Sequence, residues 1–345
     1  MSAQRIQRVT ERSAWSSSEL AHDPSWRYTL SAQELDELEV ATAQVRASGL
    51  RVGEFTREDF PLPSLGRRIA AMADEVENGR GVALLHGVPV QDHDADSLRV
   101  LYWGIGVHAG IPISQNSKGQ LLAEVTDKGN DYGDINARGF ATSAELLPHV
   151  DTSDMTTLLC LRAARSGGES RVVSSTAVYN AIVLERPQYL DILYRGFHND
   201  LRGEGPTGDV NELTVNRVPV FSDYEGRVSC SFNYRMIQSA SEKSGVPLTD
   251  SERAALDFLR EVSLRDELLY RFVLAPGDLQ MISNHSLFHS RATFVDHDEP
   301  SRRRCLLRFW INMRNGRPLE ADFAARYNTG PRGGVAVGQG ARYEF

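Results

Sequence analysis

The sequence lacks several features that would point to a secreted, disulfide-bonded or membrane-embedded protein. Among 345 residues there are 3 cysteines, Cys160, Cys230 and Cys305, at wide spacing and without a CxxC pair. An odd number so arranged does not indicate a disulfide scaffold and fits a reducing compartment. No stretch approaches the ~18 apolar residues that span a bilayer, and the N-terminus has no uninterrupted apolar run like that of a signal peptide. We expect a cytoplasmic protein without a membrane partner.

A basic excess is also missing. Lysine and arginine number 38 against 46 aspartates and glutamates, and the formal net charge is -8. A protein that neutralises nucleic-acid phosphates normally shows a basic excess or a clear basic block. The one dense cationic cluster is Arg302, Arg303, Arg304 and Arg308. We therefore expect no nucleic-acid partner.

Helical patterns dominate the first third of the chain and strand patterns the remainder. Residues 1–30 are polar and irregular, which is typical of an N-terminal arm or a poorly ordered tail. Ser31 with Glu34, and Thr249 with Glu252, form the capping boxes of two helices. Many short strands after a helical region indicate an α+β protein with a β-sandwich or distorted jelly-roll core. Helices are predicted over residues 31–48, 63–79, 94–110, 175–194 (one or two helices, interrupted at Pro187) and 247–264, and strands over 81–90, 155–164, 170–175, 226–234 and 302–313.

The stretch "LLPHVDTSD" places His149 and Asp151 two residues apart, in front of an apolar run. Residues i and i+2 of a strand share one face, so this imidazole and carboxylate can bind one metal ion. A solvated or capping pair is the ordinary alternative for such a dipeptide. The third ligand would come from "SNHSLFHSRATF", as either His285 or His289. Two histidines and one carboxylate with open coordination positions are typical of non-haem Fe(II) oxygenases.

Arg304 and Arg308 lie four residues apart in "RRRCLLRFWI", a pattern of a buried or half-buried strand. A guanidinium is rarely placed there without an anionic partner. A small dicarboxylate such as 2-oxoglutarate can supply one through a bidentate pair. The alternative is a solvent-facing pair of arginines at a sheet edge.

Three sequence blocks, taken in order and spacing, resemble the TauD/TfdA family of Fe(II)/2-oxoglutarate-dependent dioxygenases. They are "LLPHVDTSD", "RAARSGGESRVVSS" and "APGDLQMISNHSLFHSRATF", the last followed by "SRRRCLLRFWINMRNGRPL". The resemblance implies that His149, Asp151 and His289 are the iron ligands, and that His285 is a packed or hydrogen-bonded core histidine. It also implies a double-stranded β-helix (jelly roll) core with flanking helices, roughly over residues 80–320 of one catalytic domain spanning 31–345.

The same resemblance implies the cosubstrates Fe(II), 2-oxoglutarate and O2. It favours Arg308 as the anchor of 2-oxoglutarate, with Arg304 as second choice, and adds Ser170 from the block after Gly-Gly. Gln115 and Asn116 match a polar position near the substrate, although Asn116 also suits a turn. Arg235 is either a partner for an anionic substrate or a surface arginine.

The expected reaction is oxidation of a C–H bond of a small molecule, with hydroxylation as the default outcome. Desaturation, epoxidation and cyclisation use the same centre and stay open. The resemblance argues against halogenation, because Asp151 fills the position that a halide would need. A zinc hydrolase using the same three ligands is disfavoured, because the sequence has no HExxH or comparable motif to supply its general base. A non-catalytic binding protein is disfavoured because it would be expected to have lost metal ligands, and all three are present. The substrate is not identified, and a homo-oligomer is compatible with the sequence.

Overall fold

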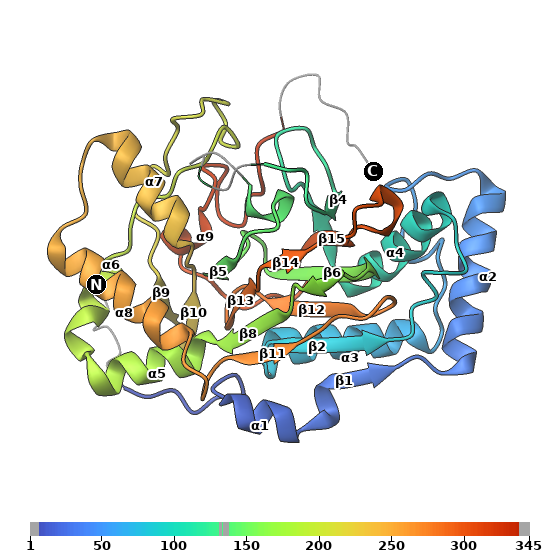
Figure 1. The fold of residues 1–345 in the computed structure, drawn as a ribbon, viewed down its shortest axis with the longest axis horizontal. Helices are drawn as coiled ribbons and strands as arrows, with labels where there is room; N and C mark the ends of the chain where they lie inside the picture. Colours follow the sequence, from blue (N-terminus) through green and yellow to red (C-terminus); the bar gives the residue numbers. More distant parts are fainter. Residues whose placement is uncertain (1–6, 131–132, 134–137, 338–345) are drawn as a thin grey trace.

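The computed structural model describes residues 7–130, 133 and 138–337 of the chain. Its strands lie in the middle of the molecule, with α2 and α4 at one end and α5 to α8 at the other (Figure 1). The helices are α1 (Ser17–His22), α2 (Ala32–Ser48), α3 (Leu65–Asn78), α4 (Ala95–Ala109), α5 (Ser175–Glu185), α6 (Leu190–Arg195), α7 (Tyr234–Ser244), α8 (Asp250–Ser263) and α9 (Ala321–Ala324). Among these described helices, none has the length and apolar character that crossing a membrane needs.

Seven of the described strands form the larger sheet, in the order β1-β2-β12-β6-β15-β3, with β4 also paired to β15. The pair of β1 and β2 is parallel, and the other neighbouring strands are antiparallel. These strands are β1 (Arg27–Thr29), β2 (Val82–His86), β3 (Ile111–Ile113), β4 (Leu122–Val125), β6 (Met155–Arg162), β12 (Leu279–Ser283) and β15 (Cys305–Asn312).

A second, antiparallel sheet has the order β11-β8-β13-β5. Its strands are β5 (Leu146–His149), β8 (Ser170–Ser174), β11 (Tyr270–Phe272) and β13 (Leu287–Arg291). Two short ribbons complete the described strands. They pair β9 (Phe221–Tyr224) with β10 (Arg227–Cys230), and β7 (Ser166–Gly167) with β14 (Phe294–Val295).

The two faces of β15 have different environments. Phe309 and Ile311 belong to the hydrophobic core built with α2, α3 and α4. The Phe309 ring is fully buried, and its centroid is 4.6 Å from that of Tyr102 in α4. Alternate residues from Arg304 to Arg308 project to the other side, because successive side chains of a strand face opposite ways. β15 is therefore the wall between the helical core and the interior of the two sheets.

Most of the predicted elements are present. Both capping boxes are confirmed, at the first turns of α2 and α8. The strand expected over residues 226–234 is wrong at its end, because β10 stops at Cys230 and α7 begins at Tyr234. The cause is local: the Asn233 side chain accepts the backbone N–H of Met236 and caps the helix. β4 lies in a polar, glycine-containing region for which no strand was predicted, and its strand character comes from pairing with β15.

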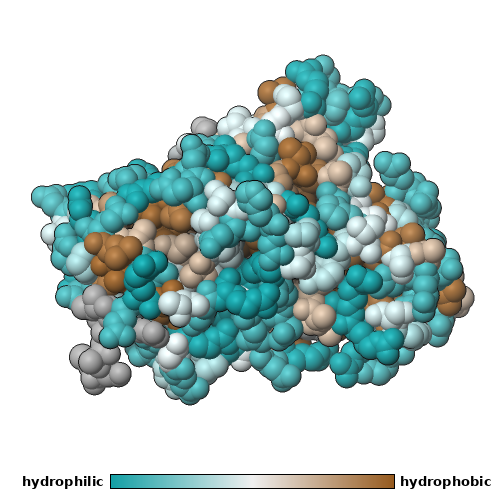
Figure 2. Space-filling view, turned by 90° about the horizontal axis from the view of Figure 1, so that it is seen from below, coloured by the Kyte–Doolittle hydropathy of each residue, from teal (hydrophilic) through white to brown (hydrophobic). Residues whose placement is uncertain are grey.

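The described part of the N-terminal segment packs onto the rest of the chain. Trp15, Leu20 and Trp26 are buried in a core cluster with residues of β2 and β6. The indole N–H of Trp15 donates to the carbonyl oxygen of Arg80 at 2.8 Å. Residues 1–6 of the expected arm lie outside the described residues. The face in Figure 2 is mainly hydrophilic with scattered hydrophobic patches, in contrast to this apolar interior.

Candidate active site

The two sheets enclose a cavity of about 290 Å³. The larger sheet lines it with residues of β4, β6, β12 and β15, and the smaller sheet with residues of β5, β8 and β13. Arg304, just before β15, and the alternate residues Leu306, Arg308 and Trp310 point into it, as the period of two requires. The volume is near the lower end for small-molecule sites. The alternation of β15 thus turns two arginines toward a potential ligand.

Two histidines of the smaller sheet face each other at this cavity. His149 ends β5 and pairs directly with His289 of β13, and their ring centroids are 4.3 Å apart. Asp151 lies just beyond β5, with Oδ2 3.8 Å from Nε2 of His289. One ligand atom of each residue lies within 4.8 Å of the other two. The structure thus brings together the three residues for which the resemblance implies iron ligation.

The protonation states of this triad suit a divalent cation. Burial, reinforced by the neighbouring His149, lowers the pKa of His289 to about 3, and burial lowers the pKa of His149 as well. Burial raises the pKa of Asp151, but the charge of Arg308 and the two imidazoles outweigh it and bring this pKa to about 2. Nδ1 of His149 donates to the carbonyl oxygen of Leu147 at 2.8 Å, which leaves the Nε2 lone pair free. Two neutral imidazoles and one carboxylate are the forms that bind metal.

Asp151 is held by two neighbours. The Thr156 hydroxyl donates to its Oδ2 at 2.8 Å, and Oδ1 of Asn284 accepts its backbone N–H at 3.0 Å. The amide nitrogen of Asn284 donates in turn to Oγ1 of Thr156 at 3.0 Å and to Oγ of Ser153 at 3.1 Å. Such outer contacts orient a ligating carboxylate. Neither Thr156 nor Asn284 was singled out as a site residue from the sequence.

His285, the alternative third ligand, makes other contacts. Its Nε2 donates to Oδ1 of Asp154 at 2.8 Å, and its Nδ1 accepts from Nη2 of Arg326 at 3.3 Å. Burial lowers its pKa to about 4 even though Asp154 favours the protonated form. A neutral imidazole with both nitrogens occupied has no lone pair for a cation. His285 is therefore a hydrogen-bonded interior residue, and His289 is the histidine that faces the triad.

Arg308 lies beside the triad and is oriented by Gln115. Its Nη1 is 3.9 Å from Oδ1 of Asp151, and its Nε donates to Oε1 of Gln115 at 2.7 Å. The Gln115 amide nitrogen also donates to the backbone carbonyl of Arg308 at 2.9 Å. The rings of Phe140 and Trp310 flank the guanidinium, with centroids 4.8 and 5.1 Å away. Gln115 thus contacts the arginine and its strand together.

Arg304 is buried but has unused hydrogen-bonding capacity. Its Nη1 is inaccessible and has no hydrogen-bond partner, and its guanidinium lies 5.2 Å from the ring centroid of Phe294. Burial lowers its pKa, yet an arginine stays charged at neutral pH. Ser170, the first residue of β8, lines the same cavity. Burying such a cation costs folding free energy unless a ligand supplies a hydrogen-bond acceptor for it.

Two further predicted residues also line the cavity. Asn116 closes a turn, because its Oδ1 accepts the backbone N–H groups of Lys118 and Gln120 at 3.0 and 3.3 Å. Arg235 lies in the first turn of α7. All nine residues predicted for the site therefore lie around one cavity. They are Gln115, Asn116, His149, Asp151, Ser170, Arg235, His289, Arg304 and Arg308.

Several lining residues come from loops and carry no pattern that predicts their place. Arg138 forms an ion pair with the buried Glu204 at 2.7 Å, which joins two loops at the cavity. Tyr327 accepts the hydroxyl of Thr152 at 2.7 Å. The only signal for Glu204 in the sequence was the glycine-rich character of the loop 201–213. Sequence alone did not indicate which of its side chains turn inward.

Comparison with known proteins gives the family. Residues 45–310 match the family described as "Taurine catabolism dioxygenase TauD, TfdA family". The chain is 33% identical to FR-33289 synthase of Streptomyces rubellomurinus (strain ATCC 31215) over 322 residues, 92% of this chain and 94% of that protein. It is 30% identical to a uridine-5'-phosphate dioxygenase of an Amycolatopsis species over 209 residues, 54% of this chain and 70% of that protein.

Solved structures show the same fold. An asparagine oxygenase in complex with Fe(II), 2S,3S-3-hydroxyasparagine and succinate aligns with a TM-score of 0.65 at 16% identity, covering 83% of this chain and 93% of that one. The non-haem iron oxygenase OrfP with Fe and alpha-ketoglutaric acid aligns with a TM-score of 0.60 at 15% identity, covering 83% and 93%.

A His-Asp-His cluster between sheets of this fold defines a non-haem iron oxygenase. The chain belongs to the TauD/TfdA family. It is an Fe(II)- and 2-oxoglutarate-dependent dioxygenase that uses O2 and acts on a small molecule. The family, enzyme class and cosubstrates predicted from the sequence are thereby confirmed.

Proposed function

We propose that the enzyme hydroxylates a C–H bond of a small organic molecule, with His149, Asp151 and His289 as its iron ligands. The observation that carries this assignment is that one ligand atom from each of the three residues lies within 4.8 Å of the other two. Fe(II) with 2-oxoglutarate and O2 supplies the oxidising chemistry, with succinate and CO2 as coproducts. The chain holds the ligands, limits water in the cavity and positions the substrate.

Arg304 is proposed as the principal anchor for the distal carboxylate of 2-oxoglutarate, with Ser170 beside it. This reverses the order that the resemblance favours, and two contacts support it. Arg308 already engages Gln115 and lies 3.9 Å from Asp151, next to the metal ligands. Arg304 is four strand positions away, about 13 Å along the chain, with an unpartnered buried N–H. A dicarboxylate chelating iron at one end needs its second partner farther from the ligands.

The metal assignment is tested by anaerobic addition of Fe(II) and 2-oxoglutarate. Wild type should develop a weak visible charge-transfer band, and His289→Ala should lose it. His22→Ala changes an exposed histidine of α1 and is the matched control. Full succinate-forming turnover by Asp151→Ala would refute the triad.

The cosubstrate assignment is tested by titrating the same band with 2-oxoglutarate. Arg304→Gln should lower the affinity for 2-oxoglutarate about 10- to 100-fold, because a charge-assisted hydrogen bond contributes about 1.5–3 kcal/mol. Arg308→Gln should lower this affinity less. The opposite order would return the anchor to Arg308.

The reaction type is tested by the mass of the product. Hydroxylation adds one oxygen atom, whereas desaturation or cyclisation removes two hydrogen atoms. Epoxidation also adds one oxygen and is distinguished by the loss of a double bond.

We further propose that the facing sheets form a double-stranded β-helix, and that residues 31–345 act as one catalytic domain. The cavity between the sheets and the mixed helix and strand content support this. A cytoplasmic location is supported by Cys160, Cys230 and Cys305, which are buried and free of disulfides. The oligomeric state can be measured by sedimentation of the purified enzyme.

A further inference from the structure

Tyr327 and Asn328 connect the segment that carries Asp151 with the loop 201–216, which contributes residues to one side of the cavity. Both residues come after residue 310, where the match to the family ends. The family match therefore assigns them no role. Their contacts show how the loop is attached to the chain around the proposed iron ligand.

Tyr327 contacts both the loop and the metal-binding segment. Its side chain is buried and lines the cavity. Its hydroxyl oxygen accepts the hydroxyl of Thr152 at 2.7 Å, and Thr152 directly follows Asp151. Its ring belongs to a small apolar cluster that includes Leu201, the first residue of the loop, and Trp310 of β15. One side chain thus packs against the loop and is hydrogen-bonded next to a proposed iron ligand.

Asn328 directs its side chain to the loop. Its amide nitrogen donates to Oε1 of Glu212 at 3.0 Å and to the carbonyl oxygen of Leu213 at 2.9 Å. Its amide oxygen accepts the backbone N–H of Val215 at 2.8 Å. Its φ of 59° is in the left-handed region, where asparagine is one of the few residues other than glycine that are often found. Asparagine at this position therefore suits the backbone conformation and makes three hydrogen bonds to the loop.

Two further contacts extend this connection. The backbone N–H of Ala336 donates to the carbonyl oxygen of Glu204 at 3.1 Å, and the guanidinium of Arg332 pairs with the carboxylate of Asp154. Residues 201–216 form no helix or strand of the described fold, so their position depends on such contacts rather than on a main-chain ladder. The C-terminal segment therefore holds the loop and the turn after β5 together.

We propose that Tyr327 and Asn328 are positioning residues that couple the order of the loop 201–216 to the iron centre. The inference rests on the proposed function, because it takes Asp151 as an iron ligand. A cation bound by Asp151 restricts the movement of the adjacent Thr152, and the hydrogen bond from Thr152 carries this restriction to Tyr327 and the loop. The coupling is reciprocal, so an ordered loop also favours the iron-binding arrangement. The loop then presents its side of the cavity to the substrate in one position.

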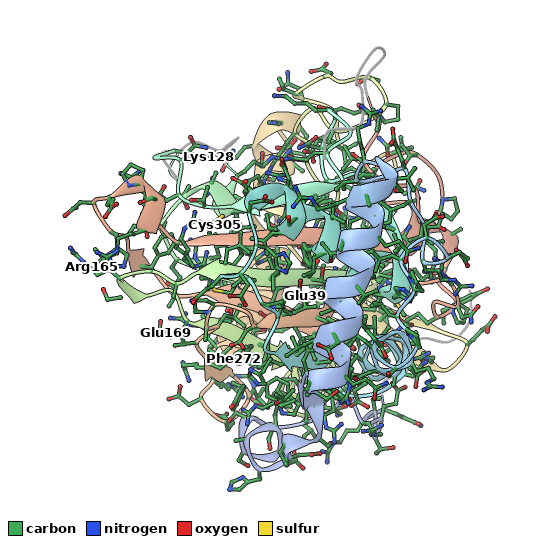
Figure 3. The ribbon with its side chains drawn as sticks, turned by 90° about the vertical axis from the view of Figure 1, so that its right-hand side faces the viewer. Glu39, Lys128, Arg165, Glu169, Phe272 and Cys305 are labelled. Atoms are coloured by element: carbon green, nitrogen blue, oxygen red, sulfur yellow. The ribbon has the colours of Figure 1, made fainter. Side chains whose placement is uncertain are left out.

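The test is hydrogen–deuterium exchange on the full chain under anaerobic conditions, with and without Fe(II). Fe(II) is added alone, because 2-oxoglutarate would enter the cavity that the loop lines. In wild type, Fe(II) should slow amide exchange in peptides from residues 201–216 about fivefold or more. In Asn328→Gly, exchange should be about tenfold faster, because three hydrogen bonds to the loop are lost, and Fe(II) should no longer slow it. Peptides around Arg165, which is exposed and lies at the margin of the molecule (Figure 3), are the internal reference.

Two variants separate the side-chain contacts from effects on the backbone. Glycine replaces Asn328 because it adopts the left-handed φ without strain. Glu225→Gly is the matched control, since Glu225 is exposed in the turn between β9 and β10 and has a φ of 52°; its loop should respond to Fe(II) as in wild type. Tyr327→Phe keeps the ring against Leu201 and removes the hydroxyl. It should lose most of the response to Fe(II), while exchange of its loop without iron stays near that of wild type.

The response to Fe(II) distinguishes a positioning role from a structural one. A lower melting temperature of Asn328→Gly with an unchanged response of the loop to Fe(II) would make Asn328 a purely structural residue and overturn the proposal. A wild-type loop that exchanges equally fast with and without Fe(II) would also overturn it. Failure of the charge-transfer band in wild type with Fe(II) and 2-oxoglutarate would instead refute the proposed function.

Discussion

Replacing Thr156 by valine tests whether the contacts around Asp151 prepare it for iron. The substitution removes the hydroxyl that donates to Oδ2 of Asp151 at 2.8 Å and accepts from Nδ2 of Asn284 at 3.0 Å. Thr156 is fully buried, so water cannot readily replace either bond. The carboxylate keeps its charge but loses one of the groups that fix its rotation.

Two magnitudes follow from these contacts. A hydrogen bond to a charged group contributes about 1.5–3 kcal/mol, so the free energy of unfolding of the metal-free Thr156→Val protein should fall by that order. Loss of a neighbour that orients a metal ligand typically lowers metal affinity 10- to 100-fold. The expected result is therefore weaker Fe(II) binding in a folded protein.

The assay is an anaerobic Fe(II) titration at saturating 2-oxoglutarate, followed by the charge-transfer band, together with urea denaturation. Thr157→Val is the matched control, since Thr157 lies next on β6 and its hydroxyl is 2.7 Å from that of Tyr102 on the other face of the strand. That variant should lose stability but keep its iron affinity. Equal iron affinity for Thr156→Val and Thr157→Val would refute the reasoning.

Three further predictions address the core, the buried histidine and the cavity wall. Phe309→Ala should lower the free energy of unfolding by about 3–5 kcal/mol in urea denaturation, because it removes a fully buried ring; a loss below about 1 kcal/mol would contradict that packing. Burial lowers the pKa of His285 to about 4 in the folded protein. As pH falls below about 6.5, the ordinary pKa of histidine, the unfolded chain therefore binds a proton at this residue before the folded protein does. Stability should then fall between about pH 6.5 and 4 by up to about 1.4 kcal/mol per pH unit, and His285→Asn should flatten this slope in denaturation series. Gln115→Ala removes the acceptor of Arg308 and should change substrate KM or kcat while leaving the 2-oxoglutarate affinity unchanged; a shift in that affinity would place Arg308 at the cosubstrate.

The structure brings the three predicted triad residues together, and the placement of two of them follows from short-range rules. His149 and Asp151 are two apart at a strand end, and the family pattern distinguished His289 from His285. The contacts of His285 with Asp154 and Arg326 explain why that choice is physically reasonable. Side-chain alternation likewise placed Arg304 and Arg308 on one face of a strand.

The remaining site residues depend on the path of the loops. Arg202, Glu204 and Tyr327 reach the cavity through long connections whose course is set by tertiary packing, and their neighbours in sequence do not reveal it. Alternation also gave Arg304 and Arg308 the same direction, so it did not separate their roles. That distinction required the contacts of Gln115 and the unpartnered nitrogen of Arg304. The start of α7 was missed although Asn233 is a favourable N-cap residue.

The direct pairing of His149 with His289 has a consequence for how this centre can change during evolution. The main-chain ladder between β5 and β13 sets the spacing of these two residues, so neither can move without disturbing a sheet. Asp151 lies outside the ladder, where the chain has already left β5. A change in the course of the segment after β5 would therefore shift the carboxylate relative to the two imidazoles while the paired strands stay intact. The relative positions of the ligands on this scaffold can change more readily at position 151 than at either histidine.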